Sequence, residues 1–426
     1  MMEKETAFKY IILEFQNQKL PKIHMRDYVL PKTDKILTII GVWRSGKTYF
    51  LYQQIRDLLN QGITKDRIVY INFEDDRLFP IKLLDMNSFL DAYFSLYPNN
   101  KKVQKYLFFD EIQVVSRWEL FIRRLYDKED VKIYLTGSSS KISFQEISTE
   151  LRGRTIPITF YPLNFKEFLH FHNIILKGNL KYSDQRYQVK KYFDEYLYEG
   201  GFPEVVISEH LKSEILHTYY EMIVYRDLVE RYSIRNTLAL KYIIKYLLTN
   251  IGNIFSINKY YNILHQQIKI SKETLIEYVG YLIETNFIFL LPYFSYSVKQ
   301  QQVNPKKVYC IDNGLRNNVA FSFSKDEGRL AENLVFLYLV KKYKEVFYWK
   351  SKNEIDFVVL LPKNGVKLIN VSYSDEELSQ REFKGFEEFK KKFPDKKYEA
   401  LIITKNKEGY RNQVKFKPLW EWVLDI

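Results

Sequence analysis

The stretch that decides the fold of this chain is the octapeptide at residues 41–48, which reads Gly41-Val42-Trp43-Arg44-Ser45-Gly46-Lys47-Thr48. It has the pattern G-x-x-x-x-G-K-[ST], the Walker A motif of a phosphate-binding loop. The apolar run 36–40 before it predicts a buried strand. The run after it predicts a helix with an apolar stripe from Leu51 to Leu59 and an end near Gly62. A strand, a glycine loop and a helix form the context that this motif requires.

The residue types of the loop indicate its chemistry. Gly41 and Gly46 allow the backbone to wrap around phosphate groups with its N–H groups pointing inward, and the helix that follows adds its partial positive charge. Lys47 can reach the β and γ phosphates, and the Thr48 hydroxyl can bind Mg²⁺. We therefore expect residues 41–48 and the adjacent Tyr49 to bind ATP together with Mg²⁺.

A second motif, which is acidic, begins 63 positions after Lys47. An apolar strand is predicted at 106–109, and it ends in Asp110-Glu111. Carboxylates at the carboxyl end of a strand are typical of the Walker B motif, because ligands bind at that edge of α/β sheets. We expect Asp110 to hold Mg²⁺ and Glu111 to orient and deprotonate the attacking water. Another strand is predicted at 67–73, and acidic residues follow it.

The next predicted strand, 131–135, leads into a segment rich in hydroxyl side chains. In ATPases with a catalytic glutamate, this strand lies between the two Walker strands, so that a polar residue at its tip faces the γ-phosphate. Ser138 and Thr136 are the candidates for this sensor, and a plain serine-rich turn is the competing interpretation. An arginine could stabilise transition-state charge; Arg154 is the first candidate and Arg152 the second, with a surface ion pair as the alternative for either.

Further motifs occur in the order found in one family. They are Leu107-Phe-Phe-Asp-Glu-Ile-Gln113, Thr136-Gly-Ser-Ser-Ser140, Leu151-Arg-Gly-Arg154, Tyr161-Pro-Leu-Asn-Phe-Lys-Glu-Phe168, Gly200-Gly-Phe-Pro-Glu204 and Tyr225-Arg-Asp-Leu-Val-Glu-Arg231. On these residues the chain resembles the AAA-type ATPases of bacteria and archaea that carry a DUF4143-like C-terminal half. The resemblance implies an αβα ATPase core of the catalytic-glutamate type, then a winged helix, then a nuclease-like domain.

We therefore predict an α/β protein with four parts. They are a lead segment at 1–34, an AAA-like ATPase domain at 35–175, a helical and winged-helix domain at 176–325, and a nuclease-like α/β domain at 326–426. The lead segment includes Arg26-Asp27-Tyr28, which is a candidate for packing near the adenine.

Residues 256–300 predict the winged helix, with two helices that begin at Ser256 and Ser271 and a β-wing that begins in the apolar run 287–291. The second helix carries one lysine and three glutamates, whereas a helix that reads the major groove is usually basic or neutral. The predicted wing carries three lysines, Lys299, Lys306 and Lys307. DNA binding and packing against protein are therefore two equal interpretations of this domain.

The last hundred residues resemble the core of the PD-(D/E)xK nucleases. Glu332 on a helix and Asp356 on a strand sit where two Mg²⁺-binding acids belong. The third element reads Asn370-Val-Ser372, so the acid is an amide and the lysine is a hydroxyl, while Lys367 points to the opposite face of a regular strand. Two carboxylates can still hold Mg²⁺ weakly, but the positive group that would steady the phosphate is missing. We expect a degenerate metal site with lost or weak cleavage.

Composition limits the remaining function classes. The 426 residues carry a formal net charge of +13, which permits contact with nucleic acid or an anionic surface. No apolar run is long enough to span a membrane, and the first residues lack an apolar signal core. A single cysteine, Cys310, gives no internal disulfide and fits a reducing compartment. We expect a cytoplasmic protein.

The leading hypothesis for function is a Mg²⁺-dependent ATPase whose hydrolysis moves the C-terminal half, either on DNA or in response to a protein, as a monomer or an oligomer. An alternative is a switch that binds nucleic acid or protein and turns ATP over slowly. A second alternative is an ATP-regulated, metal-dependent nuclease.

Overall fold

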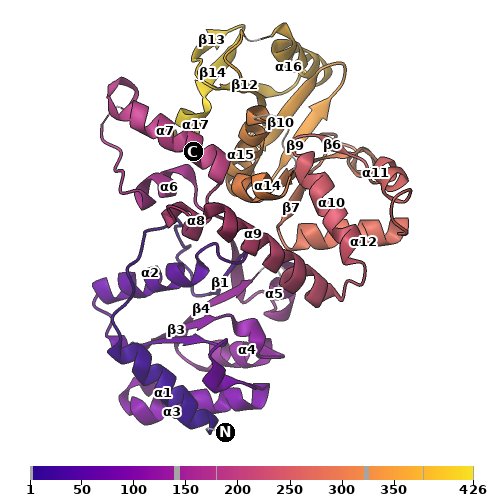
Figure 1. Ribbon diagram of the computed structural model, residues 1–426. Helices are drawn as coiled ribbons and strands as arrows, with labels where there is room; N and C mark the ends of the chain where they lie inside the picture. Colours follow the sequence, from indigo (N-terminus) through magenta and orange to yellow (C-terminus); the bar gives the residue numbers. More distant parts are fainter. Residues whose placement is uncertain (1–2, 139–143, 179, 321–325, 378, 426) are drawn as a thin grey trace. The chain divides into compact units, whose positions relative to one another are not determined.

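The computed structural model describes residues 3–138, 144–178, 180–320, 326–377 and 379–425 (Figure 1). The chain forms two compact units, Met1–Tyr161 and Pro162–Ile426. No helix within the described ranges is long and apolar enough to cross a membrane.

The first unit is built on a sheet of five strands in the order β2-β3-β4-β1-β5. Every neighbouring pair of strands is parallel. The strands are β1 (Ile36–Gly41), β2 (Ile68–Asn72), β3 (Lys105–Asp110), β4 (Val131–Ser138) and β5 (Thr155–Phe160). The strand that carries Thr136 therefore lies between the two strands that lead to the Walker motifs, as predicted.

Alternate residues of these strands face two separate apolar cores, which explains the nearly continuous hydrophobic runs in the sequence. Leu107 and Phe109 pack in one core with α1, α3 and α4, whereas Tyr106 and Phe108 pack in the other with α2. The helices of this unit are α1 (Lys4–Asn17), α2 (Lys47–Asn60), α3 (Asn87–Leu96), α4 (Trp118–Lys128) and α5 (Phe144–Glu150). This arrangement confirms the predicted αβα core.

Helix α2 lies between two glycines that have left-handed backbone conformations. Gly46, just before the helix, has a φ of 95°, and Gly62, just after it, has a φ of 85°. Only glycine adopts this region without strain. The Gly62 N–H donates to Leu59 O at 3.0 Å and closes the last turn. Leu51 and Ile55 are buried, so the predicted apolar stripe and the predicted end of the helix are both confirmed.

The second unit begins with helices and a small sheet. It starts before residue 175, the predicted boundary, because α6 packs on α7, where the rings of Phe165 and Tyr196 lie 5.4 Å apart. Helix α9 continues into a π-helical segment, Ile223–Glu230. The helices of this part are α6 (Phe165–Phe171), α7 (Gln185–Glu199), α8 (Pro203–Ile207), α9 (Lys212–Met222), α10 (Thr237–Thr249), α11 (Ile257–Leu264), α12 (Lys272–Glu284), α13 (Val298–Val303) and α14 (Asn313–Val319).

A three-stranded antiparallel sheet follows α10 to α12 in the order β6-β8-β7. Its strands are β6 (Ile254–Phe255), β7 (Ile288–Leu291) and β8 (Lys306–Cys310). The Ser256 hydroxyl accepts from Lys259 N–H, and the Ser271 hydroxyl accepts from Thr274 N–H, so both predicted caps begin their helices. This element order is the one on which the winged-helix prediction rests.

The predicted basic wing is wrong in two respects. Lys299 and the glutamines that follow it lie on α13 and not on a strand. Lys307 lies on β8 and is only 1% exposed, so its charge does not reach the surface. The sequence pattern gave no sign of this burial, because a lysine is almost never buried unless it is paired.

The C-terminal part of the second unit is a mixed sheet of six strands in the order β13-β14-β12-β11-β10-β9. Helix α15, which carries Glu332, begins at Glu327. The elements are α15 (Glu327–Lys342), β9 (Val346–Lys350), β10 (Glu354–Leu361), β11 (Gly365–Ser372), α16 (Gln380–Lys392), β12 (Lys397–Thr404), β13 (Gly409–Arg411), β14 (Val414–Pro418) and α17 (Leu419–Asp425). The helix and three strands resemble the predicted nuclease core, with β9, β10 and β11 antiparallel.

The glycine pair at 200–201 has a packing role. A Cβ on Gly200 would lie 2.1 Å from Asp312 Oδ1, and one on Gly201 would lie 2.4 Å from Leu163 O. The Gly201 N–H donates to Asp312 Oδ2 at 2.7 Å, and the Leu315 N–H donates to Oδ1 at 3.0 Å. Burial raises the pKa of Asp312 to about 6. This motif therefore holds the first turn of α14 in place.

Candidate functional site

The phosphate-binding loop connects the end of β1 to the first turn of α2. Lys47 is 5% exposed, and its ammonium donates to Gly41 O and Val42 O, both at 3.1 Å. Ser45 donates its hydroxyl to Val42 O at 2.8 Å, which holds the loop closed on itself. The left-handed Gly46 lets the chain enter the helix directly. The start of α2 therefore points its first N–H groups toward the space that the loop surrounds.

The lead segment supports the loop through Arg26. This side chain is 5% exposed and donates from Nη1 to Ser45 O at 2.7 Å and from Nη2 to Tyr161 O at 2.8 Å. Its guanidinium also lies over the ring of Phe160, 4.2 Å from the centroid. Arg26 therefore connects the loop to the end of β5, and the packing of the segment Arg26-Asp27-Tyr28 near the adenine stays a prediction.

Asp110 is the centre of the first site. It is 1% exposed, and its Oδ2 accepts from the Thr48 hydroxyl at 2.7 Å and from the Tyr70 hydroxyl at 2.9 Å. Its Oδ1 accepts from the Thr136 hydroxyl. The Walker A and Walker B residues thus meet through neutral donors, and a carboxylate beside a hydroxyl is the kind of oxygen ligand set that Mg²⁺ prefers. The residues fit such an ion.

Glu111 follows in a backbone conformation that is rare for a residue with a side chain. Its φ is 52°, and its N–H donates to the Thr136 hydroxyl at 3.1 Å. Gln113 donates its amide to Glu111 Oε2. Burial raises the pKa of Glu111; Lys47 opposes this shift, and the charge of Asp110 adds to it. Unusual backbone angles of this kind cluster at active sites.

The structure brings Thr136 to the site, and its serine alternative can be placed only in part. Ser138 lies at the end of β4, where its backbone pairs with Gly41. Its side chain lies outside the described residues, as do Ser139 and Ser140. Tyr70 is the neighbour of Asp110 that the sequence analysis did not name. A tyrosine on β2 beside the Walker B strand could have been found by aligning the predicted strands.

Arg154 lies away from the loop of its own chain. Its carbonyl accepts from Ile36 N–H at 2.9 Å, at the start of β1, whereas the loop follows the end of β1. A strand of this length spans about 17 Å. The Arg154 guanidinium pairs with Asp127, with Nε 2.9 Å from Oδ1, and Arg152 lies in the same turn before β5. Arg154 therefore lies away from the loop of its own chain, and its role in stabilising transition-state charge stays a prediction.

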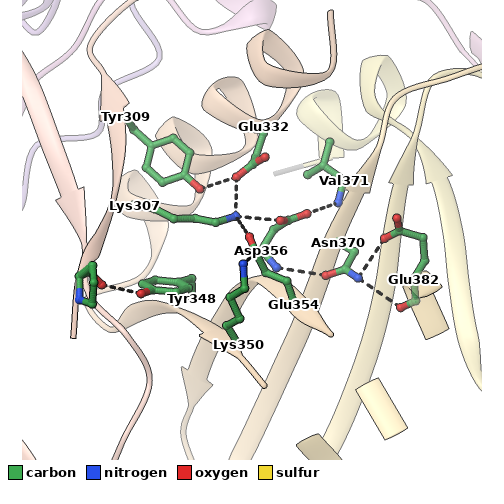
Figure 2. Close-up of polar contacts among 11 residues, drawn as sticks. Lys307, Tyr309, Glu332, Tyr348, Lys350, Glu354, Asp356, Asn370, Val371 and Glu382 are labelled. Carbon is green, nitrogen blue, oxygen red and sulfur yellow. Dashed lines mark hydrogen bonds and ion pairs between the residues drawn. The ribbon is translucent and has the colours of Figure 1, made fainter. Parts of the chain in front are cut away.

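A second group of acids lies in the second unit, around Lys307 (Figure 2). The Lys307 ammonium lies 2.9 Å from Glu332 Oε1, 2.7 Å from Glu354 Oε1 and 2.9 Å from Asp356 Oδ1. Tyr309 donates its hydroxyl to Glu332 Oε1 at 2.7 Å. The structure thus brings the two predicted acids together and adds Glu354 and Lys307 to them.

The third position of the nuclease-like pattern is used for structure. The Asp356 N–H donates to Asn370 Oδ1 at 3.1 Å, and Asn370 Nδ2 donates to Glu382 Oε2 at 3.1 Å. Lys367 lies near Glu399 on β12, 3.9 Å away. Lys367 is therefore on the other face of β11, as predicted.

Burial and charge act together on this group. Burial raises the pKa of Glu332 to about 7, with Asp356 adding to the shift and Lys307 opposing it. Burial alone would lower the pKa of Lys307, but the carboxylates of Asp356 and Glu332 outweigh it and raise that pKa well above its ordinary value. Glu354 could have been found from the sequence, because it alternates with Asp356 on one strand face. Nothing in the sequence links Lys307 to Glu332.

Three regions of the chain match described families. Residues 33–169 match an AAA domain, residues 190–326 match a domain of unknown function (DUF8612), and residues 327–422 match another domain of unknown function (DUF4143). Together with the loop, the acidic strand end and the strand order, these matches define the class of the protein. It is an AAA-type P-loop ATPase with a DUF4143 C-terminal region.

Two relatives extend the likeness to most or all of the chain. An uncharacterized protein of Methanocaldococcus jannaschii is 39% identical over 100% of this chain and 96% of its own length. An uncharacterized protein of Haemophilus influenzae is 33% identical over 76% of this chain and 80% of its own. The chain belongs to the family that these proteins share. A solved structure, the Walker-type ATPase of Pyrococcus abyssi, is similar at 14% identity with a TM-score of 0.41, covering 74% of this chain and 94% of that one.

Proposed function

We propose that this chain binds ATP with Mg²⁺ at residues 41–49 and hydrolyses it. The observation that carries the proposal is the hydrogen bond of 2.7 Å from the Thr48 hydroxyl to Asp110 Oδ2. It joins the loop and the acidic strand end into one site, and Glu111 follows directly on that strand end. A phosphate-binding loop, an acid for the metal and a second acid for the water are the parts that phosphoryl transfer to water needs.

Each side chain of this site has a separate task in the proposed mechanism. The loop N–H groups and the Lys47 ammonium bind the phosphates, and Lys47 exchanges its bonds to loop carbonyls for bonds to phosphate oxygens. Thr48 and Asp110 would hold Mg²⁺, which when bound neutralises charge on the phosphates. Glu111 accepts the proton of the attacking water. Its position is fixed by the bonds to Gln113 and Thr136.

We further propose that hydrolysis switches the second unit in response to a protein partner and not through DNA bound to α12. The charged residues exposed on α12 are one lysine and three glutamates, Lys272, Glu273, Glu277 and Glu284. Ile276 and Ile283 are exposed on the same helix, at 46% and 37%. An acidic surface repels phosphates, whereas exposed isoleucines suit a protein contact. The burial of Lys307 removes one of the charges on which the DNA alternative relied.

The test is steady-state ATP hydrolysis by the wild type and by Glu111→Gln, with and without duplex and single-stranded DNA. We expect the variant to bind ATP with nearly unchanged affinity and to turn it over about a hundred to ten thousand times more slowly, because it lacks the general base. Glu119→Gln, which removes an acid from the first turn of α4, is the matched control and should behave as the wild type.

The outcomes separate the hypotheses. Normal turnover by Glu111→Gln would show that the assigned base is wrong. Stimulation of the wild type by DNA that fades as salt rises would favour a DNA-coupled machine, because phosphate contacts release counterions. Turnover that depends on Glu111 and is indifferent to DNA supports a protein partner.

A further inference from the structure

The acid group around Lys307 has a lysine ammonium at its centre. An ammonium group has three N–H donors and no acceptor. In Lys307, one carboxylate oxygen from each of three residues lies within 2.9 Å of the nitrogen, and the side chain is 1% exposed. Figure 2 shows the ammonium at the point where the three carboxylates converge. Lys307 donates hydrogen bonds to Glu332 and Asp356 and forms an ion pair with Glu354.

We propose that the Lys307 ammonium occupies the cation position of a cradle formed by Glu332, Glu354 and Asp356. In this cradle the ammonium stands in place of a divalent metal ion. The site is then a permanent, buried cluster of ion pairs. It connects β8 of the small sheet to α15 and β10 of the nuclease-like part.

The charges of the cradle support this assignment. Three carboxylates face Lys307, and Glu354 also pairs with Lys350, at 2.9 Å from its Oε2. Two ammonium groups therefore leave one negative charge if every acid is ionised. A divalent ion added beside Lys307 would place further positive charge within a few ångströms of a buried ammonium, at a large electrostatic cost.

A catalytic role for Lys307 does not fit its contacts. A lysine that steadies a phosphate points its ammonium at the ligand, whereas the Lys307 ammonium donates to Glu332 and Asp356 and pairs with Glu354. Asp356 uses its other oxygen to accept from Val371 N–H at 2.9 Å. The cradle residues are therefore committed to one another, and the degenerate metal site predicted from the sequence does not fit a metal.

Other contacts also connect the small sheet to the nuclease-like sheet. The Phe294 N–H donates to Tyr348 O at 2.7 Å, and the Tyr348 N–H donates to Pro292 O at 3.0 Å, so the segment after β7 pairs with β9. The Tyr348 hydroxyl donates to Pro305 O, just before β8. Backbone pairing and the buried ammonium thus hold the two parts in one register. The small sheet and the nuclease-like sheet are expected to move as one body.

The experiment removes the ammonium and offers Mn²⁺ in its place, on the full chain without nucleotide. Mn²⁺ binding is measured by electron paramagnetic resonance, and Tm is measured with and without the ion. The single variant Asp356→Asn should bind the same amount of Mn²⁺ as the wild type. Lys307→Ala should lower Tm by about 10 °C, gain one Mn²⁺ site, and regain Tm when the ion is added. The double variant Lys307→Ala/Asp356→Asn should lose the gained site.

Lys350→Ala is the matched control, because Lys350 pairs with the same Glu354 but has a side chain that is 49% exposed. It should gain no Mn²⁺ site and change Tm by no more than about 2 °C. If Lys307→Ala does not fold in metal-free buffer, refolding is compared with and without Mn²⁺, and recovery only with the ion supports the proposal. Equal failure in both, no gained site, or a wild-type Mn²⁺ site that Asp356→Asn removes would overturn it.

Discussion

Asp110 in the first unit and Asp356 in the second are both aspartates in β-strands of an α/β sheet, yet their partners differ in charge. Asp110 accepts from three hydroxyls, those of Thr48, Tyr70 and Thr136. Asp356 faces the ammonium of Lys307 at 2.9 Å. In the first unit the lysine of the site, Lys47, donates instead to backbone carbonyls of the loop.

This difference separates an exchangeable site from a permanent one. A hydroxyl can rotate and let a cation take its place beside a carboxylate without leaving a charge behind, because the group is neutral. Removing one partner of a buried ion pair leaves an uncompensated charge and is strongly destabilising. In the mechanism that we propose, the hydroxyl-bound Asp110 gains and loses Mg²⁺ with each nucleotide. The ammonium-bound Asp356 is suited to hold the fold.

The largest expected effect tests whether the two lysines have separate roles. Lys47→Ala should lose ATP turnover by about a thousandfold or more, because the positive charge on the phosphates is gone, with little change in urea unfolding. Lys307→Met should keep turnover and lower the free energy of unfolding by about 3–5 kcal/mol, because the carboxylates lose their partner. Turnover and urea unfolding are measured on both variants. Loss of turnover in a well-folded Lys307→Met variant would show that the two lysines do not have separate roles.

A smaller loss of ATP turnover is expected from Thr136→Val, which tests whether Thr136 positions Asp110 and Glu111. The variant removes the hydroxyl that donates to Asp110 and accepts from Glu111 N–H. Two hydrogen bonds of about 1 kcal/mol each correspond to a fall in turnover of about tenfold to a hundredfold, with ATP affinity changed only a few fold. Both quantities are measured.

Two controls accompany Thr136→Val. Thr136→Ser keeps the hydroxyl and should keep turnover. Thr38→Val removes a buried hydroxyl of the same sheet, which bonds to Thr155 at 2.8 Å, and should leave turnover unchanged. Equal turnover in Thr136→Val and the wild type would mean that this residue does not position Glu111.

The first unit could be predicted from the sequence because its information is local. The strands and α2 follow from short apolar runs and from glycines beside them, and the strand order follows from the class of the Walker motifs. Arg154 was the first candidate for the arginine that stabilises transition-state charge. The direction of β5 places it away from the loop of its own chain, since a residue before a parallel strand lies at the edge opposite the ligands.

The second site could not be predicted, because its information is long-range. Lys307 meets Glu332 and Asp356 across 25 and 49 positions of the chain. A lysine on a predicted wing is ordinarily taken as solvent-exposed, and only its pairing explains its burial. The acids Glu332 and Asp356 were found because their order along the chain resembles a known core, but that resemblance implied a metal where the structure places an ammonium.

The last prediction is a pH dependence that belongs to the second site alone. The pKa of Glu332 rises from its ordinary value of 4.5 to about 7, in a site where Lys307 and Tyr309 face it from β8 and Glu354 and Asp356 face it from β10. A carboxyl whose folded pKa is raised costs stability as pH rises from the unfolded value through the folded one. Urea unfolding should therefore show Glu332→Gln gaining stability relative to the wild type between about pH 4.5 and about pH 7, and a constant difference above that range.

Glu399→Gln is the control for this series, because the Glu399 side chain is 66% exposed and lies 3.9 Å from Lys367 on the other face of the sheet. Its difference from the wild type should be nearly constant with pH. A constant difference for Glu332→Gln as well would mean that Glu332 is ionised throughout. The three carboxylates of the cradle would then all be charged, with only the ammonium groups of Lys307 and Lys350 to balance them. The cradle would carry more negative charge than the raised pKa of Glu332 indicates. A second cation could then bind in the cradle, and Asp356 would differ less from Asp110 than we propose.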